Sequence, residues 1–421
     1  MDVKIYPGFA RGEINCPYSK SILHRALICA SLASGRSTIN NITLSEDIMA
    51  TIHCLRVLGA EIKLGDNQII VKGIKEGNGK DEVLEVNESA STLRFLIPIS
   101  TLFKDNVVFV GKKSLFQRPL MVYEKLFKEQ KLTFIKEEDK LAISGRIQGE
   151  EFKILGDSSS QFFSGLLFYL PLLPEASTIY IQKPYYSQGY VALTIAILKK
   201  FGITVTQKSR YELFIPGNQK YKATTINNEI DYSHLAFWLG LSAFNGSLVC
   251  HNVDLVSKQP DFKIIRILRS AGARIERKGR NLFCEPSQYT LNNIGVNNQP
   301  DLGPILACIA SQSTDKVTLT GLVRIISKES NRLRAVCNNL KNLSIDITKY
   351  SLDRITVHPG KVRALEDLDS YHDHRIFMAF TVLATISENP VIIKNCECIN
   401  KTYPDFLKDL EKLQIKFEYI N

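Results

Sequence analysis

The segment CLRVLGAEIKL (54–64) combines the end of a helix, a short turn and a strand of alternating polarity. The same order recurs five times: KLFKEQKLTFI (125–135), AILKKFGITVT (196–206), RILRSAGARIE (266–276), NNLKNLSIDIT (338–348) and KDLEKLQIKFE (408–418). The turn residues are separated by 72, 71, 70, 72 and 70 positions: Gly59, Lys131, Gly202, Gly272, Ser344 and Gln414. Such regular spacing indicates repeated structural units, here six units of about 70 residues.

A second helix recurs in phase with the turn, and it is almost entirely apolar. Its six occurrences are RALICASLASGRSTINNI from 25, RFLIPISTLFKDNVVFV from 94, QFFSGLLFYLPLLPEASTIYI from 161, HLAFWLGLSAFNGSLVCHNV from 234, LGPILACIASQSTDKVTLTGL from 302 and RIFMAFTVLATISENPVII from 375. A helix that is apolar on all sides has to be enclosed. We therefore expect an α/β fold of two similar domains, each with three such helices inside three outer layers of sheet and amphipathic helix.

The boundary between the domains falls near residues 224–233, where no linker rich in Pro, Gly or Ser separates the halves. We expect one domain to contain residues 14–227. The other contains residues 228–421 and is closed by the N-terminal strand of residues 1–13. Two domains without a flexible tether suggest a hinge and a cleft between them.

The composition of the 421 residues, 44% hydrophobic and 23% charged, is that of an ordinary globular protein and excludes disordered and collagen-like classes. The longest apolar runs, 235–244 and 303–310, are shorter than the roughly 18 residues that a membrane span needs. Met1 leads directly into VKIYP rather than into a signal peptide, so we expect a cytoplasmic protein. Nine cysteines without a CxxC pair predict reduced, mostly buried thiols instead of disulfides or a zinc site.

The net charge of +10 suits either nucleic acid or a cleft for small polyanions, and the positions of the charges decide between them. Basic residues stand beside small polar residues where the apolar helices begin, as in Pro17-Tyr18-Ser19-Lys20-Ser21 before Arg25. Comparable segments are 88–92 before Arg94, 158–161, 300–301 and 372–375. Helix N-termini attract anions, so several of them at one cleft would hold a strongly anionic substrate. Taken singly, each serine cluster is more typical of an N-cap, and each cation of a solvated surface charge.

These residues belong to a series of motifs: PYSKSILHRAL (17–27), NESASTLRFLIP (87–98), QRPL (117–120), SSSQFFSGLL (158–167), YSQGYVALT (186–194), PDLGPILA (300–307), SKESNRLRA (327–335), YHDHR (371–375) and NKTYPDF (400–406). In content and order the series resembles the 5-enolpyruvylshikimate-3-phosphate synthase family over nearly the whole chain. The resemblance implies two domains, each of three βαβαββ units around buried helices (an inverse α/β barrel), with the active site in the cleft between them. It also implies transfer of the enolpyruvyl group of phosphoenolpyruvate to the 5-hydroxyl of shikimate 3-phosphate, in the shikimate pathway that leads to chorismate and the aromatic amino acids.

The resemblance assigns most of the candidate residues to one of the two substrates. For phosphoenolpyruvate it implies Lys20, Ala90, Arg118, Gln161, Arg332, Arg375 and Lys401. For shikimate 3-phosphate it implies Lys20, Ser21, Arg25, Ser159, Ser160, Gln161, Ser187, Asp301 and Lys328, with Tyr190 as a further candidate. Each substrate carries a carboxylate and a phosphate, which explains the need for so many cations.

The reaction also needs groups that move protons, because the 5-hydroxyl loses a proton and the methylene carbon gains one on the way to a tetrahedral ketal. The resemblance implies Asp301 as the base that orients the hydroxyl, Glu329 as the proton donor and Lys20 as a further proton-transfer group. A carboxyl that acts as an acid needs a raised pKa, whereas cations around Glu329 would lower it. The assignment of the two protons therefore stays open. Taken alone, Asp301 would be typical of a helix cap and Glu329 of a charge on a helix face.

The pair His372 and His374 could suggest a metal site, but no third ligand accompanies it. We therefore expect neither a metal nor an organic cofactor. The expected partners are the two small-molecule substrates, without nucleic acid or membrane, and we expect a monomer.

Some positions depart from residues common in the family, namely Tyr18, Glu88, Arg324 and Asn331, and none of them removes a proposed cation or proton carrier. Ala90 stands where the family often has Gly, against the phosphoenolpyruvate site. Its methyl group should crowd the longer inhibitor glyphosate more than the substrate, so we expect reduced glyphosate sensitivity.

Three other interpretations stay open. UDP-N-acetylglucosamine enolpyruvyl transferase has similar repeats, but its loop before the unit-two Arg-Pro typically carries Asp or Cys, which residues 112–117 lack, and its N-terminal Lys is typically followed by Asn instead of Ser21. A nucleic-acid-binding module would cluster its cations, whereas here the distinguishing arginines stand about 70 residues apart. An inactive relative with the same fold is the third.

Overall fold

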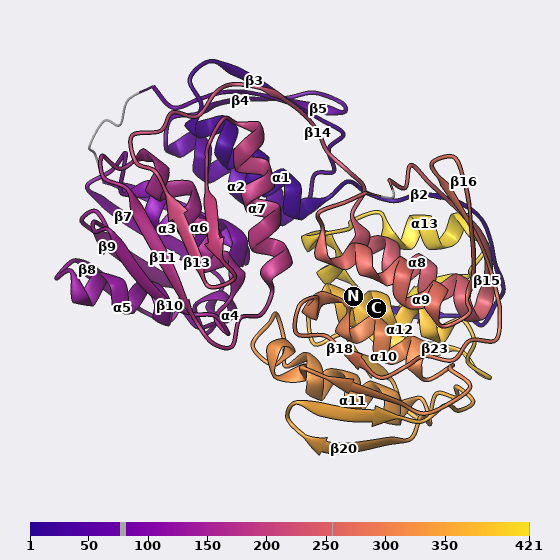
Figure 1. The fold of residues 1–421 in the computed structure, drawn as a ribbon. Coiled ribbons are helices and arrows are strands. Elements are labelled where there is room, and N and C mark those ends of the chain that lie inside the picture. Colours follow the sequence, from indigo (N-terminus) through magenta and orange to yellow (C-terminus); the bar gives the residue numbers. More distant parts are fainter. Residues whose placement is uncertain (76–80, 255, 421) are drawn as a thin grey trace. The chain divides into compact units, whose positions relative to one another are not determined.

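The computed structural model describes residues 1–75, 81–254 and 256–420 (Figure 1). Six residues with a left-handed backbone conformation mark its repeats. All six turn residues of the sequence repeat have a positive φ, of 113°, 56°, 79°, 97°, 62° and 67° in chain order. Each follows the end of a helix, and the next N–H bonds back to a carbonyl five residues earlier, as from Ala60 to Leu55 at 2.9 Å and from Ile345 to Leu340 at 2.9 Å. This closure needs the left-handed conformation that Gly adopts without strain. The predicted sixfold repeat is confirmed.

An amphipathic helix precedes each of these turns: α2 (Glu46–Val57), α5 (Met121–Glu129), α7 (Gln188–Lys200), α9 (Lys263–Ser270), α11 (Arg332–Asn342) and α13 (Phe406–Lys412). The apolar helices are α1 (Lys20–Leu32), α3 (Ala90–Ser100), α6 (Ser160–Tyr169), α8 (Tyr232–Asn245), α10 (Gly303–Ala310) and α12 (His374–Ala384). Every residue of α10 and of α12 is buried, as expected of helices that are apolar on all sides. Short helices complete the set: α4 (Lys113–Phe116), η1 (Leu170–Leu172), η2 (Pro260–Phe262), η3 (Pro300–Leu302), η4 (Leu322–Ile325) and η5 (Cys396–Lys401).

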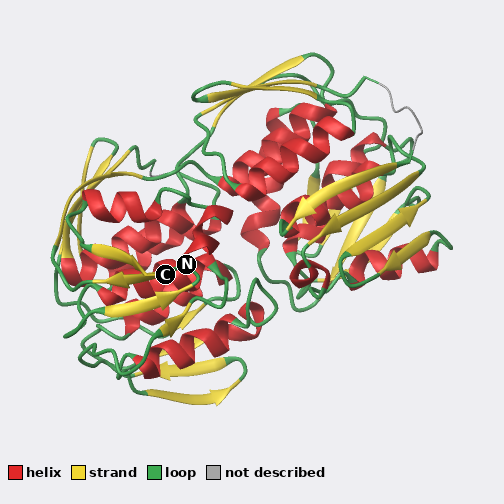
Figure 2. Ribbon diagram, turned by 180° about the vertical axis from the view of Figure 1, so that it is seen from behind, coloured by secondary structure: helices red, strands yellow, loops and turns green. Residues whose placement is uncertain are grey.

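The strands of the described ranges form six sheets of four strands, and each sheet combines one parallel pair with two antiparallel pairs. Figure 2 shows the helices of each half of the chain packed between its sheets. Three sheets contain β14 (Thr225–Asn227), β3 (Arg36–Asn40), β5 (Gln68–Lys72) and β4 (Glu61–Leu64); β6 (Glu82–Asn87), β7 (Asn106–Gly111), β9 (Lys140–Ser144) and β8 (Thr133–Lys136); and β10 (Glu151–Leu155), β11 (Ser177–Gln182), β13 (Glu212–Ile215) and β12 (Thr206–Ser209). The other three contain β16 (Arg274–Lys278), β17 (Asn281–Glu285), β15 (Gly246–His251) and β2 (Ala10–Asn15); β18 (Ile294–Gly295), β19 (Val317–Thr320), β21 (Arg354–Val357) and β20 (Ile347–Ser351); and β22 (Leu368–Asp369), β23 (Val391–Lys394), β1 (Asp2–Ile5) and β24 (Phe417–Ile420).

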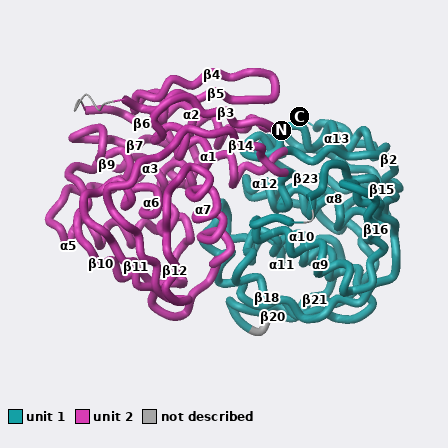
Figure 3. The backbone as a smooth tube through the Cα atoms, turned by 45° about the horizontal axis from the view of Figure 1, so that its top comes forward, with its two compact units in different colours: residues 1–17, 230–421 teal, residues 18–229 magenta. Residues whose placement is uncertain are grey.

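The chain divides into two compact units: unit 1 contains residues 1–17 and 230–421, and unit 2 contains residues 18–229 (Figure 3). Both N-terminal strands belong to unit 1, where β1 lies between β23 and β24 and β2 runs parallel to β15. In unit 2, β14 returns to lie parallel to β3. The division drawn from the sequence lies at 13/14 and 227/228.

Two expectations from the composition can be compared with the structure. No helix in the described part of the chain is long and apolar enough to cross a membrane. All nine cysteines are unpaired in the structure, eight of them buried and Cys398 partly exposed, so the prediction of mostly buried cysteines is confirmed.

Candidate active site

Arg332, the first residue of α11, is the centre of an ion network in unit 1. Its side chain is buried, and each of its three nitrogens donates to a different carboxylate. Nε lies 2.7 Å from Asp373 Oδ2, Nη1 2.8 Å from Asp301 Oδ1 and Nη2 2.6 Å from Glu329 Oε2. Burial alone would lower the pKa of the guanidinium, but the three carboxylates raise it above its ordinary value. Arg332 therefore stays charged and holds these carboxylates in place.

Asp301, on η3, faces further cations besides Arg332. Lys328 Nζ lies 3.4 Å from Oδ1, and Arg375 Nη2 lies 3.2 Å from Oδ2. Burial would raise the pKa of the Asp301 carboxyl, but Arg375, Lys328 and Arg332 together hold it well below its usual range. Asp301 is therefore a carboxylate at neutral pH, and the structure places it in this network instead of at a helix N-cap.

Glu329 lies between two cations of the same unit. Its Oε2 binds Arg332, and Lys401 Nζ, at the end of η5, lies 3.8 Å from its Oε1. Both the Glu329 and the Lys401 side chains are nearly buried. The structure thus brings six predicted residues of unit 1 together: Asp301, Lys328, Glu329, Arg332, Arg375 and Lys401.

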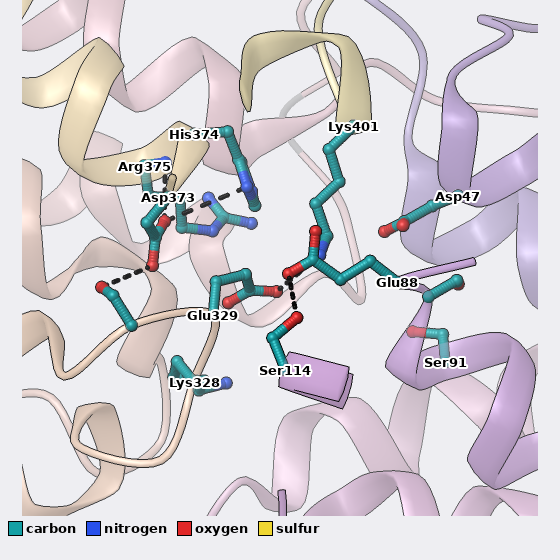
Figure 4. A network of polar contacts seen from close by, with 12 residues as sticks. Asp47, Glu88, Ser91, Ser114, Lys328, Glu329, Asp373, His374, Arg375 and Lys401 are labelled. Carbon is teal, nitrogen blue, oxygen red and sulfur yellow. Dashed lines mark hydrogen bonds and ion pairs between the residues drawn. The ribbon is translucent and has the colours of Figure 1, made fainter. Parts of the chain in front are cut away.

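Asp373 fixes the start of α12 as well as Arg332, and Figure 4 shows it beside Arg375 and His374. Its Oδ1 accepts the backbone N–H of Arg375 at 2.9 Å, which is the N-cap bond of the helix. The two preceding residues, Tyr371 and His372, have positive φ values of 53° and 55°. Non-glycine residues are held in this conformation only by their surroundings, and such positions concentrate at functional sites.

His372 and His374 belong to this segment. Among the described residues, no group of three or more His, Cys, Asp or Glu side chains is arranged to hold a metal ion. His374 is buried, with its Nδ1 3.9 Å from Asp373 Oδ1.

Lys20, the first residue of α1 in unit 2, is paired with Asp47 in the first turn of α2. Lys20 Nζ lies 2.6 Å from Asp47 Oδ2, and the two side chains are 17% and 6% exposed. An opposite charge this close fixes the direction of the Lys20 side chain. The structure therefore gives Lys20 a buried carboxylate partner that the sequence motifs do not indicate.

A buried arginine, Arg94 of α3, organises the next part of unit 2. Its Nη1 donates to Gln161 Oε1 at 2.7 Å and its Nη2 to the carbonyl of Pro119 at 3.0 Å. Gln161 in turn donates from Nε2 to Ser91 Oγ at 2.9 Å. Arg94 thus holds the predicted ligand Gln161 and the residue that follows the predicted ligand Arg118.

Other predicted residues of unit 2 lie at helix ends. Ser19, Ser89 and Ser159 are N-caps of α1, α3 and α6, as their sequence context suggests. Ser160 and Ala90 are the first residues of α6 and α3 and are nearly buried. Ser21 is the second residue of α1, and Ser187, with φ of 53°, precedes α7, the helix that contains Tyr190.

Arg25 lies deeper in unit 2 than a surface cation. Its Nε donates to Thr194 Oγ1 at 2.8 Å and its Nη1 to the carbonyl of Ser21 at 2.7 Å. Burial lowers the pKa of Arg25 to about 10. The guanidinium therefore ties α1 to α7.

Sequence reasoning missed the partners that hold the predicted residues, above all Asp47, Arg94 and Asp373. In the sequence, Asp47 is an ordinary acidic residue in the first turn of a helix, and Asp373 only separates two histidines. Arg94 belongs to the motif NESASTLRFLIP (87–98), which marks it as a candidate. Its role, however, depends on Gln161 and Pro119, which lie 67 and 25 positions away. Only the fold brings these pairs together.

Comparison with known proteins gives consistent results. The family model described as EPSP synthase (3-phosphoshikimate 1-carboxyvinyltransferase) matches residues 7–410. The chain is 39% identical over 417 residues to the 3-phosphoshikimate 1-carboxyvinyltransferase of Clostridium perfringens (strain 13 / Type A), covering 98% of each chain. It is 36% identical over 423 residues to the enzyme of the same name from Clostridioides difficile (strain 630), covering 98% of this chain and 97% of the relative.

Solved structures agree on the fold. EPSP synthase from Acinetobacter baumannii superposes with a TM-score of 0.80 at 22% identity, covering 99% of this chain and all of the other. The enolpyruvyl transferase NikO from Streptomyces tendae gives a TM-score of 0.79 at 13% identity, covering 100% of this chain and 98% of the other.

Proposed function

This chain belongs to the EPSP synthase (3-phosphoshikimate 1-carboxyvinyltransferase) family, and from that premise we propose how its residues carry out the family's reaction. The enzyme transfers the enolpyruvyl group of phosphoenolpyruvate to the 5-hydroxyl of shikimate 3-phosphate and releases phosphate. The observation that carries the residue assignments is the ion network of unit 1, in which the carboxylates of Asp301, Glu329 and Asp373 lie among four cations: Lys328, Arg332, Arg375 and Lys401.

Asp301 is the group that receives the hydroxyl proton in this proposal. In the unliganded protein its low pKa makes it a weak base, because Arg375, Lys328 and Arg332 all stabilise its charge. Anionic substrates that engage Arg375 and Lys328 would neutralise these cations and raise the pKa of Asp301. Substrate binding would thus prepare Asp301 to orient the 5-hydroxyl and take its proton.

The proton for the methylene carbon has two candidate donors. Lys20 Nζ lies 2.6 Å from Asp47 Oδ2, so a nearly buried carboxylate positions this amine. Glu329 lies 3.8 Å from Lys401 Nζ and 2.6 Å from Arg332 Nη2, so two cations fix the position of its carboxyl group. We assign Lys20 as the donor of this proton and keep Glu329, which also orients Lys401, as the second candidate donor.

The cations bind the substrates' phosphate and carboxylate groups. Phosphoenolpyruvate is held by Lys20, Arg118, Gln161, Arg332, Arg375 and Lys401 beside Ala90, and shikimate 3-phosphate by Lys20, Ser21, Arg25, Ser159, Ser160, Gln161, Ser187, Asp301 and Lys328. Guanidinium groups suit both kinds of anion, because their paired N–H groups bind carboxylate and phosphate in a bidentate way. Arg332 donates four of its five N–H groups to carboxylates in this structure, so a ligand bound in a bidentate way would have to displace at least one of them.

Asp301→Asn tests the assignment of the base. The variant keeps the shape of the side chain but cannot accept a full proton, and we expect phosphate release from the two substrates to fall by about a thousandfold. The matched control is Asp315→Asn, which removes the same charge from an exposed residue of unit 1 and should leave turnover unchanged. Turnover of Asp301→Asn within about tenfold of wild type would remove Asp301 from the chemistry.

The alternative acceptor, UDP-N-acetylglucosamine, is not favoured, because the curated relatives carry the name of the shikimate enzyme. We further propose that the enzyme acts in the cytoplasm as a monomer, on small molecules alone and without a cofactor. Sedimentation at concentrations used for the assay tests the monomer directly, and a stable dimer would contradict it.

A further inference from the structure

Glu88 lies immediately before helix α3, and the N-terminus of a helix attracts anions. It stands between the end of β6 and Ser89, the N-cap of α3, immediately before the positive end of that helix. The preceding residue, Asn87, has a positive φ of 50°, and its carbonyl accepts the N–H of Lys112 at 2.8 Å. Gly111 permits this approach, because a Cβ there would lie 2.3 Å from the same carbonyl oxygen. The segment before Arg118 is thereby fixed against the start of α3.

The Glu88 carboxylate makes one hydrogen bond and two longer ion pairs with residues 112–118. Oε1 accepts the hydroxyl of Ser114 at 3.0 Å, the contact drawn in Figure 4, and lies 3.8 Å from Arg118 Nη2. Oε2 lies 3.7 Å from Lys112 Nζ. The side chain of Glu88 is 14% exposed and that of Arg118 is 6% exposed, so solvent screens their attraction only weakly. A hydroxyl, an ammonium and a guanidinium around one carboxylate are the donors that a phosphate or carboxylate ligand would also use.

We propose that Glu88 is a specificity-determining residue that acts as a built-in competitor of anionic ligands for Arg118. This inference rests on the proposed function, in which Arg118 binds phosphoenolpyruvate. While the site is unliganded, the Glu88 carboxylate restrains Arg118 and Ser114. When phosphoenolpyruvate binds, the Arg118 guanidinium pairs with the ligand instead of with Glu88. The Glu88 carboxylate is then no longer neutralised, and its negative charge repels the bound phosphate. Glu88 therefore weakens the binding of anions at Arg118 while it keeps the guanidinium aligned.

Glu88→Gln removes the charge of the side chain and keeps its shape. The amide can still accept the Ser114 hydroxyl, but it no longer attracts Arg118 or repels the ligand. We expect the KM for phosphoenolpyruvate to fall about three- to tenfold, with kcat within about threefold of wild type and the KM for shikimate 3-phosphate unchanged. Competitive inhibition by inorganic phosphate against phosphoenolpyruvate should strengthen by a similar factor. Glu88→Asn provides a second uncharged variant if the first folds poorly, and it should shift both constants in the same direction.

Two controls distinguish this account from a general effect of charge or a structural one. Glu138→Gln removes the same charge from a 79% exposed side chain that pairs with Lys113 at 2.6 Å, and it should leave the KM for phosphoenolpyruvate unchanged. Ser114→Ala removes the neutral hydrogen bond and keeps the Glu88 charge, so it should not lower that KM. An unchanged or raised KM in Glu88→Gln, or an equal fall in Glu138→Gln or Ser114→Ala, overturns the inference.

The failure of this inference can be told apart from the failure of the proposed function. If the wild-type enzyme turns over both substrates and Glu88→Gln has the same KM, the inference falls and the function stands. If the wild-type enzyme releases no phosphate, the function falls. Calorimetric titration of phosphoenolpyruvate, with and without shikimate 3-phosphate, then decides the inference: tighter binding to Glu88→Gln than to wild type supports it, and equal, weaker or undetectable binding to both contradicts it.

Discussion

Arg332 Nε donates to Asp373 Oδ2 at 2.7 Å, and both side chains are almost completely buried. The carboxylate of Asp373, which caps α12, therefore also holds Arg332, the first residue of α11. Arg332 in turn engages Asp301 and Glu329, the two carboxylates proposed to take part in proton transfer. The position of the proposed catalytic carboxylates therefore depends on Asp373, which is not itself proposed to touch substrate.

Removal of the Asp373 charge should destabilise the protein. Asn can still cap α12, but Asp373→Asn leaves the buried Arg332 with one carboxylate fewer, and we expect a loss of about 2–4 kcal/mol in the free energy of unfolding. The control Asp405→Asn affects a 62% exposed side chain paired with Lys408 and should cost less than about 1 kcal/mol. Urea unfolding at neutral pH measures both, and equal midpoints for the two variants would contradict the account.

Loss of either candidate proton carrier should strongly slow turnover without unfolding the protein. We expect Lys20→Met and Glu329→Gln to keep the circular dichroism spectrum of wild type and to lower kcat for phosphate release by about a hundredfold or more. Lys72→Met is a matched control for the lysine, since Lys72 lies in an exposed pair with Glu61. Near-normal turnover of either active-site variant refutes the role given to that residue.

His24 should make stability depend on pH in a mildly acidic range. Its ring is buried in unit 2, with Nδ1 2.8 Å from Thr51 Oγ1, and burial lowers its pKa from 6.5 to about 3. Between these values the unfolded chain takes up a proton that the folded chain does not, so stability is full above pH 6.5 and falls as the pH decreases. From pH 6.5 to about pH 5 this single group should cost about 2 kcal/mol. Urea unfolding of wild type and His24→Gln across this range tests it: the variant should lose about 2 kcal/mol less, and parallel curves would show that His24 becomes protonated in the folded state.

Ala90 should reduce sensitivity to glyphosate. Its methyl group stands at the first position of α3, nearly buried, beside the proposed phosphoenolpyruvate site. We expect Ala90→Gly to increase inhibition by glyphosate, measured as the inhibition constant against phosphoenolpyruvate. Strong inhibition of the wild type at concentrations near its KM for phosphoenolpyruvate would refute the prediction.

The repeat was the part of the fold most open to prediction from sequence, because its signals are local. A left-handed residue after a helix and an apolar helix are both properties of short segments, and all six turn positions from Gly59 to Gln414 could be named without a structure. From the sequence we expect residues 1–13 to close the domain of residues 228–421, but the strands that pair there could not be named. β2 pairs with β15 and β14 with β3, and such pairings between distant segments leave little trace in either strand.

The candidate site divides in the same way. Charged residues such as Lys20, Asp301 and Arg332 stand in recognisable motifs, so sequence alone could propose them. Their partners could not be proposed, because an ion pair such as Lys20 with Asp47 depends on how two helices pack and not on the motif of either residue. The motif likewise gives no sign that Arg332, proposed as a ligand for substrate, donates four of its N–H groups to three carboxylates.

The central claim, enolpyruvyl transfer to shikimate 3-phosphate, is tested most directly by phosphate release from phosphoenolpyruvate in the presence of each acceptor separately. The account predicts release with shikimate 3-phosphate, one phosphate for each enolpyruvyl ether formed, and none above background with UDP-N-acetylglucosamine. Release with UDP-N-acetylglucosamine alone, or with neither acceptor, would contradict it.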